Sequence, residues 1–373
     1  MIILTYIFIA VLAVVVGFAA YAAIHATSAR RMGRRALLSR SPRNPILAPN
    51  SNEPWENAAV FNPAAVYANG RVHLFYRALG MDGISRIGYA VSADGIHFER
   101  SSRPAFAMRT PSPARFKNPF SSSEKLHYDT GLYASGGGWG GSEDPRAVLI
   151  EGRVYMTFGV FESWESLRIA LTSIGLNDID ARRWNWAPHF FISPHNEAHK
   201  NWVMFPEKIR GKFAILHALS PDIRIEYVDS LDGLAEHPIR SNNKRSGRAG
   251  HWDAFVRGAA APPIKTKYGW LLLYHGMKPK EHVGYKVGAV LLDIDDPTKI
   301  LYRSAAPILE PREWYENDWK PGVVYASGAI VKDGMLFVYY GGGDKWVNVA
   351  TAPLEQFLQA LMAGGQAELS RAV

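Results

Sequence analysis

A carboxylate pair between glycines and a proline is the first feature of this sequence that could do chemistry. Glu143 and Asp144 lie in the segment GSEDPR, residues 141–146. We expect the following proline to hold Asp144 in an extended conformation, and the glycines to allow another backbone to approach closely. A carboxyl group fixed in this way can transfer a proton. The tetrapeptide alone is a weak signal, because Asp before Pro is common in turns.

A repeated strand pattern would position this carboxyl group. In each copy a glycine turn is followed by alternating apolar residues and then by an aromatic residue or His. The copies are GRVHLFY from Gly70, GRVYMTF from Gly152, GKFAILH from Gly211, GWLLLYH from Gly269 and GMLFVYY from Gly334. Their spacings of 82, 59, 58 and 65 residues fit propeller blades of four strands with loop insertions.

We therefore predict an all-β fold, a five-bladed β-propeller over residues 44–362, in which strand ends converge on a central axis and form a funnel-shaped pocket. An ordinary β-sandwich is the alternative, because its strands also have period 2. Residues 101–141 lack strand periodicity and are interpreted as a loop insertion over the pocket mouth. The segment APLEQFLQALMAG predicts a helix, and residues 363–373 are interpreted as a tail.

The N-terminus predicts a membrane anchor. The run from Ile2 to Ile24 has no charge and is long enough to cross a bilayer, so residues 1–25 are interpreted as a transmembrane helix. A cleaved signal peptide is the alternative. The linker 26–43 carries six arginines, at positions 30, 31, 34, 35, 40 and 43, which can contact anionic lipid. The positive-inside rule then predicts a single-pass membrane protein with a cytoplasmic catalytic domain.

Composition excludes several classes of site. The net charge is +8, and removing the six linker arginines leaves +2, so nucleic acid binding is not predicted. The chain has no cysteine, which excludes disulfides, thiolate zinc sites and a cysteine nucleophile. His195 and His199 have an i, i+4 spacing, but HNEAHK lacks the glutamate of the HExxH motif. No metal and no cofactor are expected.

Seven segments in order resemble glycoside hydrolase family 130, the β-mannoside phosphorylases and mannosidases built on a five-bladed β-propeller. They are FNPAAV (61–66), LFYRA (74–78), GSEDPR (141–146), MFPEKIRGKFAILH (204–217), PPIKTKYGWLLLYHG (262–276), VGAVLLDIDDP (287–297) and YYGGGD (339–344). The resemblance implies an enzyme that cleaves a β-mannoside oligosaccharide or glycoconjugate with inversion.

The same resemblance implies roles for individual residues. Asp144 would be the general acid, acting through the 3-hydroxyl of the sugar. Residues implied to bind the substrate are Asn62, Arg77, Arg146, His217 and Asp344. Inversion needs a second group or nucleophile on the opposite face of the sugar ring. The acid must also stay protonated near neutral pH, which burial or the neighbouring Glu143 could promote.

The resemblance leaves hydrolysis and phosphorolysis open. Phosphorylases of the family hold inorganic phosphate with basic side chains, because an anion in a pocket needs compensating charge. The four positions read Lys200, Ala218, Val256 and His275, so only Lys200 and His275 are candidate phosphate ligands. Strand alternation would point the neighbouring Arg257 to the opposite face, whereas a loop at this position would let Arg257 reach into the site. We therefore expect hydrolysis slightly before phosphorolysis, with phosphate as co-substrate only in the second case.

Hydrolysis would require a carboxylate base. Glu207, Asp253 and Glu281 are candidates by motif order, and each has a plain alternative as a surface or ion-paired residue. A catalytically silent glycan-binding propeller is the alternative from another functional class. A furanosidase of the other five-bladed families is a further alternative, but the order of motifs does not match its three carboxylates. The sequence leaves the oligomeric state open.

Overall fold

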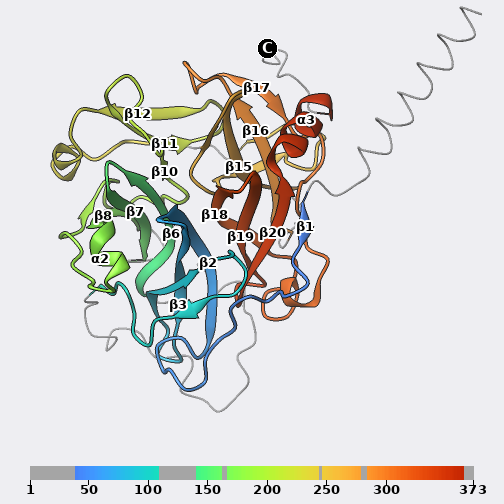
Figure 1. The fold of residues 1–373 in the computed structure, drawn as a ribbon. Coiled ribbons are helices and arrows are strands. Elements are labelled where there is room, and N and C mark those ends of the chain that lie inside the picture. Colours follow the sequence, from blue (N-terminus) through green and yellow to red (C-terminus); the bar gives the residue numbers. More distant parts are fainter. Residues whose placement is uncertain (1–37, 109–139, 162–165, 243–245, 279–283, 365–373) are drawn as a thin grey trace, which may run out of the picture.

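The computed structural model describes residues 38–108, 140–161, 166–242, 246–278 and 284–364. This part of the chain is all-β, and its sheets form five blades around an axis (Figure 1). Blades 1 and 2 are joined into one sheet, because β4 pairs with β6 in parallel through Ile84 and Ser85. The five-bladed architecture predicted from the strand repeats is therefore confirmed.

The strands follow the chain blade by blade. Blade 1 contains β2 (Ala59–Ala68), β3 (Arg71–Leu79), β4 (Ile84–Ser92) and β5 (Glu99–Arg100). Blade 2 contains β6 (Gly140–Ile150), β7 (Arg153–Phe161), β8 (Leu167–Gly175) and β9 (Phe190–Phe191). Blade 3 contains β10 (Val203–Met204), β11 (Phe213–Ala218) and β12 (Arg224–Val228). Blade 4 contains β13 (Phe255–Ala259), β14 (Ile264–Thr266), β15 (Gly269–Met277), β16 (Lys286–Leu292) and β17 (Ile300–Arg303). Blade 5 contains β18 (Val324–Lys332), β19 (Met335–Gly342), β20 (Trp346–Pro353) and β1 (Ser39–Arg40).

The repeated sequence pattern forms the second strand of every blade in the order in which the strands pair. These strands are β3, β7, β11, β15 and β19. In four blades the preceding first strand has a register shift against it: in β2, β6, β13 and β18. A bulge inserts a residue into the pairing and breaks the alternation of side chains. The positions at these bulges supply much of the candidate site described below.

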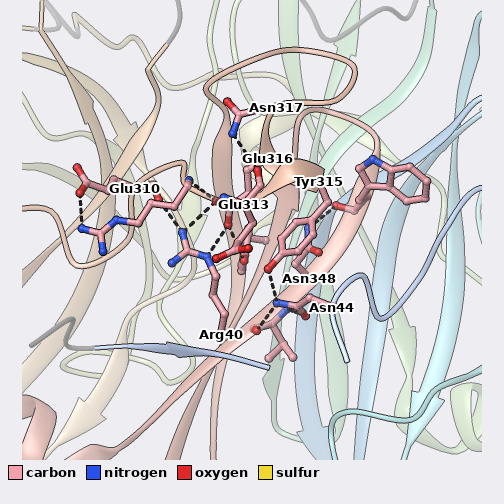
Figure 2. Close-up of polar contacts among 12 residues, drawn as sticks. Arg40, Asn44, Glu310, Glu313, Tyr315, Glu316, Asn317 and Asn348 are labelled. Atoms are coloured by element: carbon pink, nitrogen blue, oxygen red, sulfur yellow. Dashed lines mark hydrogen bonds and ion pairs between the residues drawn. The ribbon is translucent and has the colours of Figure 1, made fainter. Parts of the chain in front are cut away.

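The last blade is closed by the N-terminal strand β1, which pairs with β20. Figure 2 shows Arg40 and Glu316, which hold this closure: Arg40 Nε donates to Glu316 Oε1 at 2.7 Å. The hydroxyl of Tyr340 donates to the same oxygen at 2.9 Å. Glu316 has no exposed side-chain surface. Arg40 falls within residues 26–43, the predicted lipid-facing linker, and its guanidinium instead stabilises the ring closure.

The same three-residue arrangement occurs in two other blades. A tyrosine hydroxyl of the second strand donates to a buried carboxylate, and an arginine of the outermost strand pairs with that carboxylate. The sets are Tyr76, Glu56 and Arg100 in blade 1, and Tyr274, Asp253 and Arg303 in blade 4. Each set ties the middle of a blade to its outer edge, so these charged groups have a structural role.

The predicted C-terminal helix is confirmed as α3 (Leu354–Gly364), which buries Phe357, Leu358 and Leu361 against blades 4 and 5. A second helix, α2 (Leu176–Asp180), and two short 3₁₀ turns, η3 (Asp232–Ala235) and η4 (Trp314–Glu316), were not predicted.

The prediction of a single-pass membrane protein is corrected. Within the described ranges, no helix is long and apolar enough to cross a membrane. The longest, α3, has 11 residues and is about 16 Å long, roughly half the thickness of the bilayer core. The predicted span, residues 2–24, lies outside the described residues, and so does most of the loop insertion, residues 109–139. The membrane localisation and the lipid contact are therefore not retained.

Candidate active site

Asp144 lies at the bulge of β6, between Glu143 and Arg146, and only 8% of its surface is exposed. Its φ of +47° is in the left-handed region, so the predicted extended conformation is wrong. Aspartate tolerates this region better than most residues, and the bulge imposes it despite the following proline. The nearby Gly141 is needed for a close approach, because a Cβ there would lie 2.0 Å from the Ser85 carbonyl oxygen.

Asn62 repeats this geometry in the neighbouring blade. It precedes Pro63 at the bulge of β2 and has a φ of +48°. Its side-chain Nδ2 donates to Asp144 Oδ1 at 2.7 Å. The first strands of blades 1 and 2 thus each carry an Asx-Pro pair at a bulge, and the side chains of Asn62 and Asp144 are hydrogen-bonded to each other. The matching Asn-Pro and Asp-Pro dipeptides were a sequence signal for this arrangement.

Arg77 contacts both Glu143 and Asp144 and is 1% exposed. Its Nη1 is 3.2 Å from Asp144 Oδ1, its Nη2 is 3.0 Å from Glu143 Oε1, and its Nε donates to Ser85 Oγ at 3.0 Å. The guanidinium also packs over the ring of Phe61, 4.8 Å from its centroid. Arg77 therefore fixes the direction in which both carboxylates point.

The charge state of Asp144 differs from the expectation. Burial raises the pKa of this carboxyl, but the charges of Arg77, Lys200 and Arg146 and the hydrogen bond from Asn62 outweigh burial and lower the pKa to about 2. In the ligand-free protein Asp144 is therefore ionised at neutral pH. Protonation of this group requires a change in the charges around it.

Arg146 connects four blades at the axis. Its Nη1 donates to the Asp144 carbonyl at 2.7 Å, and its Nε donates to the Ala260 carbonyl at 3.2 Å. Its Nη2 donates at 3.0 Å both to Asn201 Oδ1 and to the hydroxyl of Tyr325. With these donors engaged, Arg146 holds the backbone of Asp144 in place. Asn201 and Tyr325 belong to this network, although the sequence analysis named neither of them.

Asp344 approaches the same cluster from the turn between β19 and β20. Burial lowers the pKa of Arg77, but the charges of Glu143, Asp144 and Asp344 raise it, so Asp344 lies close enough to act on this guanidinium. Its Oδ2 is 3.0 Å from Lys320 Nζ, a contact that the sequence analysis missed. The predicted Asp344 thus lies near Arg77, which itself bonds to Asp144.

Lys200 and Arg257 add positive charge beside the carboxylates. Burial lowers the pKa of Lys200. The charges of Glu143 and Asp144 raise this pKa, and those of Arg77 and Arg257 lower it, so all five groups interact electrostatically. Arg257 lies at the register shift of β13, which breaks strict alternation. The prediction that alternation turns Arg257 away from the site therefore loses its basis.

The two predicted histidines lie in different surroundings. His275 is fully buried and stacks on Tyr325 at 4.1 Å between ring centroids. Burial and the charge of Arg146 hold its pKa well below the usual value, while Asp144 opposes them, so His275 belongs to the cluster as a neutral ring. His217 packs on Trp202, and burial with the charges of Arg224 and His199 lowers its pKa to about 4. None of the groups that shift His217 belongs to the cluster.

An open pocket lies between blade 2 and the segment that leads into blade 3. It is small, with a cavity volume of about 10 Å³, which is room for about one water molecule. Its lining includes the charged side chains of Asp144 and Lys200 and the aromatic rings of Phe158 and Trp202. The acidic group and a cation therefore face one space.

The candidate bases for hydrolysis do not lie in this pocket. Glu207 is half-exposed and pairs with Lys265 at 2.5 Å. Asp253 is fully buried and is bonded to Tyr274 as part of the blade 4 arrangement. Glu281 lies outside the described residues. In the described part of the chain, no group of three or more metal-ligating side chains could hold a metal ion.

The comparisons with known proteins decide the family. A family model described as beta-1,4-mannooligosaccharide phosphorylase matches residues 134–363. The chain belongs to glycoside hydrolase family 130. A 1,2-beta-oligomannan phosphorylase of Thermoanaerobacter is 37% identical over 324 residues, covering 84% of this chain and 96% of the relative. A beta-1,2-mannobiose phosphorylase of the same genus is 34% identical over 333 residues, covering 86% and 98%.

A solved structure agrees with this family. The beta-1,2-mannobiose phosphorylase from Listeria innocua, in complex with beta-1,2-mannobiose, superposes with a TM-score of 0.64 at 25% identity. The match covers 87% of this chain and 99% of that chain. The chain is therefore an enzyme of a family that acts on β-mannosides.

Proposed function

We propose that this enzyme is an inverting β-mannoside phosphorylase that transfers the terminal mannosyl unit of a β-1,2-linked mannoside to inorganic phosphate. The observation that carries the proposal is the pair of cations, Lys200 and Arg257, in the same electrostatic field as Asp144. A multiply charged anion needs such compensating charge in a partly buried site. The sequence has Ala218 and Val256 at two of the four positions that carry basic residues in the phosphorylases. In this proposal Arg257 provides one of the two missing positive charges.

The charge state of Asp144 fits a phosphate-dependent reaction. Without a ligand, Arg77, Lys200 and Arg146 outweigh burial and keep this carboxyl ionised. Phosphate bound beside Lys200 adds negative charge that offsets these cations, so the pKa of Asp144 rises and the carboxyl takes up a proton. In this account the co-substrate itself prepares the acid.

The reaction then proceeds in one displacement. Asp144 gives its proton, through the 3-hydroxyl of the mannosyl unit, to the glycosidic oxygen as the bond from C1 to that oxygen breaks. A phosphate oxygen attacks C1 from the opposite face and forms the new bond, which inverts the anomeric configuration. The products are α-mannose 1-phosphate and the shortened mannoside. Asn62, Arg77 and Asp344 would contact the mannosyl unit, because they surround Asp144.

Hydrolysis is less well supported. A water nucleophile needs a base on the far side of the sugar, and the described candidates Glu207 and Asp253 are engaged outside the pocket. The similar enzymes from Thermoanaerobacter are also named as phosphorylases. The β-1,2 linkage is proposed from these relatives, and the β-1,4 linkage is the second candidate, because the family model carries that description.

The test is to incubate the purified enzyme with β-1,2-mannobiose or β-1,4-mannobiose, with and without phosphate. We expect mannose 1-phosphate from the β-1,2 substrate only when phosphate is present, and a loss of about a hundredfold or more in Asp144→Asn. Release of free mannose at the same rate without phosphate would overturn phosphorolysis. Faster turnover of the β-1,4 substrate would overturn the linkage.

A further inference from the structure

Trp314 is the most exposed large apolar side chain in the described ranges, at 59%. The next values are 43% for Met81 and 38% for Ile294. Trp314 is the first residue of η4, in the connection from blade 4 to blade 5. A single exposed apolar side chain is ordinary, whereas a group of aromatic rings can mark a binding surface. The surroundings of Trp314 indicate what it binds.

Trp314 belongs to a group of indoles that we call the Trp platform: Trp314, Trp319 and Trp346. The rings of Trp314 and Trp346 meet edge to face, with their centroids 5.5 Å apart. Lys345 Nζ lies 4.9 Å from the Trp346 ring and 5.5 Å from the Trp319 ring. Asp318 Oδ2 accepts hydrogen bonds from both Lys345 Nζ and Trp346 Nε1, at 3.0 and 3.2 Å. A hydrogen bond therefore holds Trp346, the Lys345 ammonium joins Trp319 to it, and the ring contact joins Trp314.

The Trp platform adjoins the candidate active site. Lys320, which follows Trp319, pairs with Asp344, and its backbone N–H donates to the Gly343 carbonyl at 2.9 Å. Asp344 and Trp346 are two residues apart, so their Cα atoms are at most about 7 Å apart. The turn that brings Asp344 to the carboxylate cluster thus also carries one indole of the platform.

We infer that the Trp platform binds a sugar unit of the substrate beyond the two units joined by the cleaved bond. The inference rests on the proposed function for the identity of the sugar. A mannosyl ring presents an apolar face that packs on indole, and hydroxyl groups that bond to nearby polar atoms such as those of Asp318 and Lys345. The ligand class is a neutral β-linked mannooligosaccharide of three or more units. The platform thereby favours longer substrates.

The test compares Trp314→Ala with the wild-type enzyme on β-1,2-linked mannobiose and mannotetraose. We expect the ratio of kcat/KM for the tetraose to that for the biose to fall about fivefold, as for a single aromatic contact in a binding site. Trp314→Phe should keep part of the ratio. The matched control is Tyr67→Ala, because Tyr67 is exposed and lies five residues from Asn62 at the other end of β2, about 17 Å away. An unchanged ratio in Trp314→Ala would overturn the inference.

A binding measurement separates this inference from the proposed reaction. Titration calorimetry with mannotetraose gives its affinity for the wild type and for Trp314→Ala, whatever the reaction. Weaker binding by the variant supports the platform even if no mannose 1-phosphate forms. Equal affinities, or no binding by either protein, contradict it. A change in oligomeric state on Trp314→Ala would instead show that the indole covers a second copy of the chain.

Discussion

Replacement of Asp144 by asparagine should change the way stability depends on pH. The side chain keeps its shape in Asp144→Asn but cannot ionise. In the wild type, burial raises the pKa of this carboxyl, and Arg77, Lys200 and Arg146 lower it to about 2 from the ordinary 3.8. One pH unit corresponds to about 1.4 kcal/mol, so the ionised group contributes about 2 kcal/mol to the free energy of unfolding at neutral pH.

The direction in which this contribution changes with pH follows from the direction of the pKa shift. Because folding depresses the pKa, this contribution is fully present above about pH 4 and is lost as the pH falls toward 2. About half of it is lost by pH 3. The free energy of unfolding of the wild type minus that of Asp144→Asn should therefore shrink by about 1 kcal/mol between pH 6 and pH 3.

The assay is urea unfolding of both proteins at pH 6, 5, 4 and 3, followed by tryptophan fluorescence. A difference that stays constant from pH 6 to pH 3 would refute the reasoning, because it would mean that the cations do not depress the pKa of Asp144. A difference that grows on acidification would mean that burial outweighs the cations. In that case the carboxyl would hold its proton without phosphate.

Three further substitutions test other parts of the structure. Arg257→Ala should raise the KM for phosphate about tenfold or more, because a charge-assisted contact is lost, as measured by initial rates against phosphate concentration. Glu316→Gln should lower the free energy of unfolding by about 3–5 kcal/mol, because Arg40 then lacks its buried partner, as measured by urea unfolding. Gly341→Ala should lower both stability, by about 1–3 kcal/mol, and kcat/KM, because the new Cβ would lie 2.1 Å from Asn62 Oδ1.

Each of these substitutions has a matched control in the chain. Arg153→Ala removes an exposed arginine of β7 outside the cluster and should leave the KM for phosphate unchanged. Glu310→Gln breaks a more exposed pair with Arg312 and should cost less than about 1 kcal/mol. Gly233→Ala adds a Cβ that meets nothing within 4 Å. If a control variant changes the measured KM or free energy of unfolding as much as its test variant does, the corresponding contact does not have the assigned role.

The sequence could predict the parts of the fold that local periodicity determines. The glycine-led pattern marked the second strand of each blade, and the spacing of Phe357, Leu358 and Leu361 marked the buried face of α3. Periodicity could not reveal the Tyr340, Glu316 and Arg40 closure, because Arg40 lies 276 residues from Glu316. An arginine among other arginines was therefore interpreted as part of a charged flank.

The site was predicted where a motif marks it and missed where a bulge changes direction. Asp144 stood out in GSEDPR, yet its left-handed φ depends on the register shift of β6. Strict alternation argued against Arg257, although a loop would have let it reach the site, and the register shift in β13 removes the argument from alternation. Lys320 and Tyr325 gave no signal, because their contacts with Asp344 and Arg146 join distant blades or loops. Bulges and long-range pairs are tertiary features that a single strand does not encode.

The most direct test of the account is the anomeric configuration of the first sugar phosphate formed. Proton NMR during the reaction of β-1,2-mannobiose with phosphate distinguishes the two anomers of mannose 1-phosphate, which do not interconvert because the phosphate ester blocks mutarotation. Attack by phosphate on the face opposite Asp144 predicts α-mannose 1-phosphate as the first product. The β anomer, or free mannose in place of a sugar phosphate, would contradict the account.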